Sequence, residues 1–202
     1  MDLQVLDNIV PIELLNNYNQ IQLPQIRIRC DVVGSFYNTF IEYGDVYYKN
    51  IAHTHLNKFV HKEAEDIWSW FKTKTQLELS NLDSCYVNSM SFGDEGYAHI
   101  DGENITTCIF YMNDSWHSQW SGETVFYSGN YTENYMDEWY YTHDIVKSVL
   151  PKYGRLIIFD GSIPHSVRPL SKKCLMTRTT FMLKLINTNF KDIIERLNNA
   201  TK

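Results

Sequence analysis

The chain has 202 residues, 44% of them hydrophobic and 21% charged, and these ordinary values exclude a wholly disordered protein. The formal net charge of −6 argues against a general binder of polyanions, because such proteins need a basic surface. No apolar run approaches the roughly 20 residues that a membrane-spanning helix requires, so no membrane contact is expected. The length predicts a single domain over residues 1–202.

The four cysteines are scattered along the sequence and form no Cys-x-x-Cys pair. In a chain of this length they are typical of reduced thiols rather than of a disulfide framework or a zinc site. A cytoplasmic location is therefore expected. The abundance of Asn, Ile, Lys and Tyr is typical of an AT-rich microbial or viral genome, and for a viral protein the expected compartment is the host cytoplasm.

Two helices are predicted in residues 1–80, which are expected to form a helical N-terminal support region. Pro11–Tyr18 is predicted as a short helix, because proline at an early helical position sacrifices no hydrogen bond. In His55–Lys74 the apolar residues recur at steps of three or four, as they do on one face of a helix.

After residue 82 the apolar residues alternate with a period of two, which is typical of β-strands. The predicted strands are Cys85–Phe92, Tyr97–Asp101, Asn104–Met112, Glu123–Tyr127, Arg155–Phe159, His165–Leu170 and Arg178–Leu185. These short strands predict a mainly β fold with flanking helices, namely a jelly roll or sandwich over residues 81–186. A C-terminal helix is predicted in residues 187–202, at Phe190–Leu197.

Three ionisable residues in this β region form a candidate metal site. His99 and Asp101 are two apart on a predicted strand, so their side chains point to the same face, and His165 begins another predicted strand. Two imidazoles and one carboxylate are the ligand set of non-haem Fe(II) oxygenases. Taken alone, the His-x-Asp pattern is weak evidence, because a surface histidine beside a turn aspartate gives the same tripeptide.

Several further segments occur in an order that is typical of one enzyme family. They are Phe92-Gly93 before His99-Ile100-Asp101, Thr107 to Trp116, Ser121-Gly122-Glu123-Thr124, Leu150 to Gly161, His165 to Leu170, and Arg178 to Phe181. From about Tyr86 to Leu185 the chain resembles the Fe(II)/2-oxoglutarate-dependent dioxygenases, and in particular their prolyl-hydroxylase-like branch. It departs from the pattern at Ser121, where the family often has glycine, and at Phe92, where tyrosine is common.

The resemblance implies a double-stranded β-helix, which is a cupin-like jelly roll with supporting helices. It implies that His99, Asp101 and His165 are the catalytic residues and bind Fe(II) as its ligands. The implied cosubstrates are 2-oxoglutarate and O₂, and ascorbate is compatible as a further cofactor.

The resemblance also implies which residues bind 2-oxoglutarate. Arg178 would bind the distal C5 carboxylate, Tyr111 would donate a hydroxyl hydrogen bond to it, and Thr180 would assist. An arginine suits this role because its planar guanidinium binds a carboxylate through two hydrogen bonds and stays charged when buried. Two other cations are alternatives for the same role. Arg168 lies three residues after His165 on the same predicted strand, so it should face away from that ligand, whereas Lys184 has the same strand parity as Arg178.

The function expected from these residues is an Fe(II)- and 2-oxoglutarate-dependent hydroxylase that releases succinate and CO₂. Peptidyl proline or a related amino acid is the first substrate expectation, so the partner is a protein, a peptide or a small molecule. The alternatives are a hydroxylase of a small metabolite, a nucleic-acid demethylase of the same superfamily, a non-catalytic jelly-roll binding module, and a cupin-type hydrolase or isomerase. The acidic balance disfavours a nucleic-acid substrate, and the sequence predicts no oligomeric state.

Other motifs are interpreted as structural. His53, His55 and His61 are interpreted as the solvated start of a helix rather than as a second metal site, and His117 and His143 as loop residues. The segment Tyr131–Lys147 is an aromatic and acidic insert that matches no family segment, and packing is favoured over ligand stacking for its rings.

Overall fold

A computed structural model describes residues 1–19, 52–53, 58–59, 62–92, 94, 96, 98–128, 132–133, 139–140 and 144–199. The helices are α1 (Ile12–Asn19), α4 (Lys62–Thr75) and α5 (Phe190–Asn199), with 3₁₀ turns at Leu79–Asn81 and Ser118–Trp120. The strands are β1 (Leu3–Leu6), β2 (Ala52–His53), β3 (Lys58–Phe59), β4 (Leu82–Met90), β5 (Ile105–Tyr111), β6 (Thr124–Tyr127), β7 (Thr132–Glu133), β8 (Trp139–Tyr140), β9 (Ile145–Val149), β10 (Leu156–Asp160), β11 (His165–Val167) and β12 (Arg178–Ile186).

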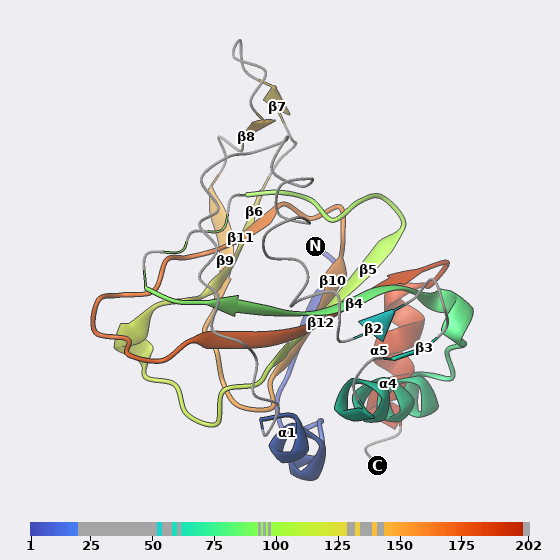
Figure 1. Cartoon of the computed structure of the whole chain (residues 1–202). Coiled ribbons are helices and arrows are strands. Elements are labelled where there is room, and N and C mark those ends of the chain that lie inside the picture. The colour runs from blue at the N-terminus through green and yellow to red at the C-terminus, as the bar shows by residue number, and fades with distance from the viewer. Residues whose placement is uncertain are drawn as a thin grey trace.

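Two antiparallel sheets form the centre of the molecule (Figure 1). The larger sheet has the strand order β1-β10-β5-β12-β4, and the smaller one has the order β11-β6-β9. Because sequence neighbours are rarely sheet neighbours here, the chain crosses repeatedly between the two layers, as it does in a jelly roll. The prediction of a mainly β, jelly-roll core with flanking helices is confirmed.

The alternation of residues along each strand divides the larger sheet into two faces. One face packs against the helices, and its buried strand residues include Cys108, Phe110, Ile158, Phe181 and Leu183. The opposite face packs against the smaller sheet, and this inner layer comprises Ile109, Tyr111, Phe126, Val149, Ile157, Phe159 and Met182. The polar residues of the candidate site lie on this second face, between the two sheets.

The helices cover the outer face of the larger sheet (Figure 1). Ile67 and Phe71 of α4 are fully buried, and Ile193 and Leu197 of α5 are almost so. Their spacing of four residues places each pair on one side of its helix. Arg196 of α5 also donates a hydrogen bond from Nη1 to the carbonyl oxygen at the end of α4, at 2.6 Å. The helices thus support the sheet from behind, away from the candidate site.

Several predicted elements differ from the structure. The long helix predicted at His55–Lys74 begins only at Lys62, and Lys58–Phe59 instead pairs with Ala52–His53 as a short hairpin; residues 54–57 and 60–61 lie outside the described part. The N-terminal region is also not purely helical, because Leu3–Leu6 pairs with β10 at the edge of the larger sheet. Such short strands contain too few residues to show a period, and their formation depends on pairing with a partner strand, nearby for Lys58–Phe59 and distant for Leu3–Leu6.

Two more differences concern the β region. Of the predicted strand Tyr97–Asp101, the described residues 98–101 form an isolated bridge at His99 rather than a strand. The end of the Tyr131–Lys147 insert contributes to β9 (Ile145–Val149). Within the described residues, no helix combines the length and apolar character needed to cross a membrane. Cys85, Cys108 and Cys174 are free thiols in the structure, whereas Cys30 lies outside the described residues.

Candidate metal centre and cosubstrate site

Two distant segments of the chain bring His99, Asp101 and His165 together. The backbones of the two histidines form an antiparallel bridge in which each N–H donates to the carbonyl oxygen of the other at 2.9 Å. Oδ1 of Asp101 lies 3.7 Å from Nε2 of His99, and Oδ2 lies 3.6 Å from Nε2 of His165. One ligand atom from each residue lies within 4.8 Å of the others. This set of two nitrogen donors and one oxygen donor fits Fe(II).

The turn that follows β10 fixes the backbone of Asp101. The carbonyl oxygen of Gly161 accepts the N–H of Asp101 at 2.8 Å, and the N–H of Gly161 donates to the carbonyl oxygen of Ile105 at 2.7 Å. A Cβ atom at Gly161 would lie 2.9 Å from both the Cβ and the carbonyl oxygen of Ile105. Glycine is therefore required where this turn touches the loop that carries the aspartate.

The carboxylate of Asp101 is held by two donors from the larger sheet. Nζ of Lys184 lies 2.7 Å from Oδ1, and Oγ1 of Thr107 donates to Oδ2 at 2.5 Å. Lys184 and Thr107 are directly paired residues on β12 and β5, so one register places both donors. Burial opposes ionisation of Asp101, but the charges that His165, Lys184 and His99 carry when protonated outweigh it and hold its pKa below the usual range.

His165 is the buried member of the pair of histidines. Its ring lies against Phe159, with centroids 4.7 Å apart, and its Nδ1 lies 2.9 Å from the carbonyl oxygen of Ile163. Burial lowers the pKa of His165 to about 4, and repulsion from His99 adds to this effect. The imidazole is therefore neutral at pH 7. Because the carbonyl oxygen of Ile163 can only accept, the proton lies on Nδ1 and the lone pair on Nε2, 3.6 Å from Oδ2 of Asp101. A neutral imidazole oriented by a carbonyl is typical of a metal ligand.

Arg178, at the start of β12, is almost completely buried, with 1% of its surface exposed. Its Nε donates to the carbonyl oxygen of Gly122 at 2.8 Å, its Nη2 donates to Oγ1 of Thr124 at 3.0 Å, and its guanidinium lies 5.1 Å from the ring centre of Tyr111. Burial lowers the pKa of Arg178, while Tyr111 and Glu123 oppose that shift. Within the part of the chain that the structure describes, no carboxylate forms an ion pair with this guanidinium.

Tyr111 and Thr180 are paired residues on β5 and β12, and both are buried beside Arg178. The hydroxyl of Tyr111 lies 2.6 Å from Oγ1 of Thr124 and donates to the carbonyl oxygen of Val149 at 3.3 Å. Oγ1 of Thr180 donates to the carbonyl oxygen of Asn88 at 3.4 Å. The fold thus gathers the three residues predicted to bind 2-oxoglutarate, and their roles toward that molecule stay predictions.

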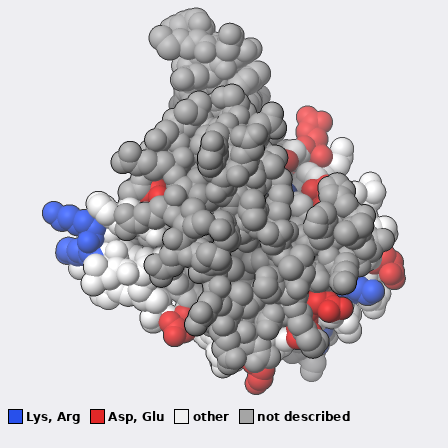
Figure 2. All heavy atoms as spheres, in the orientation of Figure 1, with Lys and Arg blue, Asp and Glu red and all other residues white. Residues whose placement is uncertain are grey.

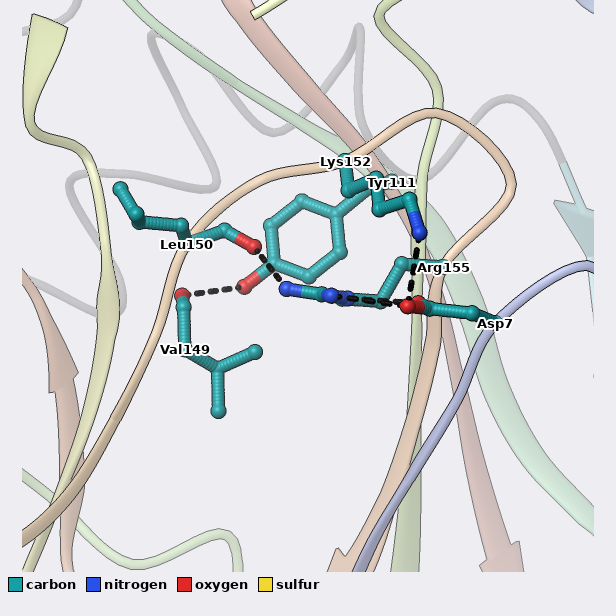
Figure 3. A network of polar contacts seen from close by, with 6 residues as sticks. All are labelled: Asp7, Tyr111, Val149, Leu150, Lys152 and Arg155. Carbon is teal, nitrogen blue, oxygen red and sulfur yellow. Dashed lines mark hydrogen bonds and ion pairs between the residues drawn. The ribbon is translucent and has the colours of Figure 1, made fainter. Parts of the chain in front are cut away.

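A second polar network lies close to Tyr111 and ties the N-terminal segment to the main sheet (Figure 3). Asp7, just after β1, accepts hydrogen bonds from Nε of Arg155 at 2.8 Å and from Nζ of Lys152 at 2.8 Å. Arg155 also donates from Nη1 to the carbonyl oxygen of Leu150 at 2.9 Å. Hydrogen bonding and attraction from Arg155, together with Lys152, hold the pKa of Asp7 below its usual range despite partial burial.

The loop before β6 supports the guanidinium of Arg178. Ser121 has φ 59° and ψ −141°, and Gly122 has φ 79°, so both residues occupy backbone regions that favour glycine. A Cβ atom at Gly122 would lie 2.6 Å from Cδ2 of Leu170 and 3.3 Å from Cδ of Arg178. This explains why the resembling family often has two glycines here, and it shows that Ser121 is the strained member of the pair.

The structure separates the two alternative cations from Arg178. Arg168 is exposed, and its backbone N–H donates to the carbonyl oxygen of Glu123 at 2.9 Å. Lys184 lies near the opposite end of β12 and contacts Asp101. Strand parity predicts which face of the sheet a side chain lies on, but not which residues it contacts there. Parity alone therefore could not exclude Lys184 as the residue that binds the cosubstrate.

The remaining histidines form no second metal site in the described residues, where His99, Asp101 and His165 are the one group of three or more suitable donors. His53 lies in β2 rather than at a helix start, which corrects that prediction. His117 precedes a 3₁₀ turn, and its Nδ1 accepts the N–H of Gln119 at 3.1 Å. The predictions for His55, His61 and His143 fall outside the described residues.

Comparison with known proteins agrees with this geometry. The family model described as the 2OG-Fe(II) oxygenase superfamily matches residues 85–183, close to half of the chain. The chain belongs to this superfamily. The enzymes that it comprises use Fe(II), 2-oxoglutarate and O₂, so the predicted enzyme class and cofactors are confirmed. No curated protein matches the chain significantly.

Solved structures support the fold. A prolyl-4-hydroxylase from Pseudomonas putida is similar with a TM-score of 0.52 and 13% identity, and the match covers 93% of each chain. Prolyl 4-hydroxylases from Phytophthora capsici give a TM-score of 0.51 at 13% identity, covering 92% of this chain and 58% of theirs. At this identity the likeness establishes the jelly-roll fold of the oxygenase and leaves the substrate open.

Proposed function

We propose that the protein is an Fe(II)- and 2-oxoglutarate-dependent hydroxylase of the prolyl-hydroxylase-like branch. His99, Asp101 and His165 would hold Fe(II), and Arg178 would bind the C5 carboxylate of 2-oxoglutarate, with Tyr111 and Thr180 beside it. The bound iron and cosubstrate would supply O₂ activation and substrate hydroxylation, with release of succinate and CO₂.

The buried guanidinium of Arg178 carries this proposal. A charge with 1% exposure is costly unless an opposite charge accompanies it. Among the described residues its hydrogen bonds go to neutral acceptors, and Glu123 attracts it without forming an ion pair. A ligand carboxylate would supply a directly paired negative charge. A metal-dependent hydrolase or a simple binding module has no need of such a buried cation without a paired carboxylate, which favours the oxygenase over those two alternatives.

The chain's own residues would prepare the site before the substrate arrives. The carbonyl oxygen of Ile163 keeps the proton of His165 on Nδ1 and leaves Nε2 as the donor atom. Gly122 and Thr124 fix the plane of the guanidinium of Arg178. The aromatic rings of Phe126 and Phe159 pack beside His165 and keep water from its buried face.

Peptidyl proline or a related amino acid is the proposed substrate. The fold likeness to prolyl 4-hydroxylases supports this class over others. The net charge of −6 disfavours a nucleic-acid substrate. On the face of the molecule seen in Figure 2, the Lys and Arg side chains of the described residues lie at separate places rather than in one basic patch. A small metabolite with a similar reactive group is the second candidate.

Spectroscopic titration of Arg178→Met tests the cosubstrate site. Anaerobic Fe(II) with 2-oxoglutarate should give the weak visible charge-transfer band of the chelate in the natural protein. The variant should retain iron but need at least about tenfold more 2-oxoglutarate for half of the band, because a charge-assisted pair is lost. Arg168→Met, at an exposed arginine, is the matched control and should behave as the natural protein. If Arg178→Met binds 2-oxoglutarate as tightly as the natural protein does, the assignment of Arg178 is refuted. A separate measurement of succinate release with panels of peptides and metabolites distinguishes the substrate classes.

A further inference from the structure

The ion pair between Lys184 and Asp101 lies inside the proposed metal centre, with the carboxylate buried and the lysine mostly buried. The Asp101 side chain is 1% exposed and the Lys184 side chain 15% exposed, with Nζ 2.7 Å from Oδ1. Thr107 satisfies the other carboxylate oxygen at 2.5 Å. The carboxylate that would bind a metal ion is thus already paired with a protein cation.

A buried carboxylate requires a nearby positive charge, and Lys184 provides it when no metal ion is bound. A divalent ion held by Asp101, His99 and His165 would supply the same carboxylate with a second and larger positive charge. Since the ammonium contacts Oδ1 directly, it would lie within a few ångströms of that ion. At such short separation, like charges in a partly buried site repel strongly.

We infer that Lys184 acts as the resident counter-cation of Asp101: it stabilises the metal-free protein and weakens metal binding. This inference rests on the proposed function, because it assigns the metal to His99, Asp101 and His165. Lys184 therefore has a different role from Arg178, because Lys184 neutralises a carboxylate of the protein, whereas Arg178 would bind a carboxylate of the cosubstrate. The consequence is a site that is ordered without metal and exchanges its metal more readily than the three ligands alone would allow.

The experiment compares Lys184→Met with the natural protein in two measurements. Methionine keeps much of the length of lysine and removes the charge. In chelator-treated protein, the melting temperature of Lys184→Met should fall by several degrees, because the buried carboxylate loses its counter-charge. In Mn²⁺ titrations followed by electron paramagnetic resonance of the free ion, the same variant should bind about tenfold more tightly or better.

Two further variants serve as controls. Lys184→Arg keeps the positive charge and should retain metal binding close to that of the natural protein. Lys152→Met removes a lysine that pairs with Asp7 at 2.8 Å, outside the metal centre, and should leave Mn²⁺ affinity unchanged. If Lys184→Met does not fold, Lys184→Gln keeps a donor without the charge, and the same tighter Mn²⁺ binding is expected of it.

The outcomes distinguish this inference from the proposed function. Natural protein that binds Mn²⁺, with uncharged Lys184 variants that bind it equally or more weakly, would overturn the inference and leave the proposed function standing. Natural protein and variants that all fail to bind Mn²⁺ would overturn both. Tighter binding in the uncharged variants together with a lower metal-free melting temperature supports the inference.

Discussion

Two aspartates in this protein each pair with a lysine but lie in different surroundings. Asp7 pairs with Lys152 at 2.8 Å and with Arg155, and its side chain is 32% exposed. Asp101 pairs with Lys184 at 2.7 Å, and its side chain is 1% exposed. Positively charged neighbours hold the pKa of both carboxyl groups below the usual range.

The difference in burial decides what each pair does. At Asp7, water screens the charges, so the network contributes about 1 kcal/mol and serves to attach the N-terminal segment to the turn before β10. At Asp101, the carboxylate itself is shielded from water, so nearby charges act more strongly on it than on Asp7. The same ion-pair chemistry thus fastens a surface segment in one place and sets the electrostatics of a metal centre in the other.

The largest effect that would sharpen this comparison is expected for Gly161→Ala. The added Cβ would meet the backbone oxygen of Ile105 at 2.9 Å, and the turn that holds the backbone of Asp101 would have to move. We expect a loss of about 3 kcal/mol in the free energy of unfolding, measured by urea denaturation, and weaker Mn²⁺ binding. A variant with natural stability and natural Mn²⁺ affinity would show that the turn does not position the aspartate.

An intermediate effect is expected for Thr107→Val, which removes the donor to Oδ2 of Asp101 while keeping the shape of the side chain. Loss of a hydrogen bond to a buried charge should lower the free energy of unfolding by about 2 kcal/mol in metal-free protein. Thr106→Val is a neighbouring control, because Thr106 bonds to Thr188 at 3.1 Å and lies on the other face of β5. Thr106→Val should lower the free energy of unfolding by about 1 kcal/mol. A larger decrease for Thr106→Val than for Thr107→Val would show that the buried charge of Asp101 does not strengthen its hydrogen bond.

The smallest effect is expected for Asp7→Asn, about 1 kcal/mol at pH 7 in thermal or urea unfolding. Because the pKa of Asp7 is lowered in the folded state, its contribution is present above the unfolded pKa of about 4 and is lost as the pH falls below that value. The natural protein and the variant should therefore converge in stability at acid pH. A constant difference down to pH 2, or a change in Mn²⁺ affinity at pH 7, would contradict the purely structural role of Asp7.

Strong periodic patterns predicted the core of the fold. The alternation from residue 104 to 112 predicted β5, observed at Ile105–Tyr111, and the last strand was placed to within one residue of β12 (Arg178–Ile186). The elements that were missed are short or lie at edges, such as β1 (Leu3–Leu6), where pairing with β10 rather than local preference forms the strand.

At the candidate site, the motif order predicted His99, Asp101, His165 and Arg178, and the fold brings the first three within reach of one metal ion. The pairing of Lys184 with Asp101 could not be predicted in the same way. Parity places Lys184 on the inner face of its strand, but the register with Thr107 and the path of the loop that carries Asp101 decide which group it meets.

The sequence by itself determined the oxygenase class, the jelly-roll layout and the donor types, because these depend on residue identity, order and strand period. The tertiary structure alone decided which charges are compensated. It buried Asp101 beside Lys184 and left Arg178 with neutral protein acceptors, although both cations lie on the same strand. The physical reason is that charge compensation depends on distance and exclusion of water across segments far apart in the chain, and neither quantity is written in local sequence.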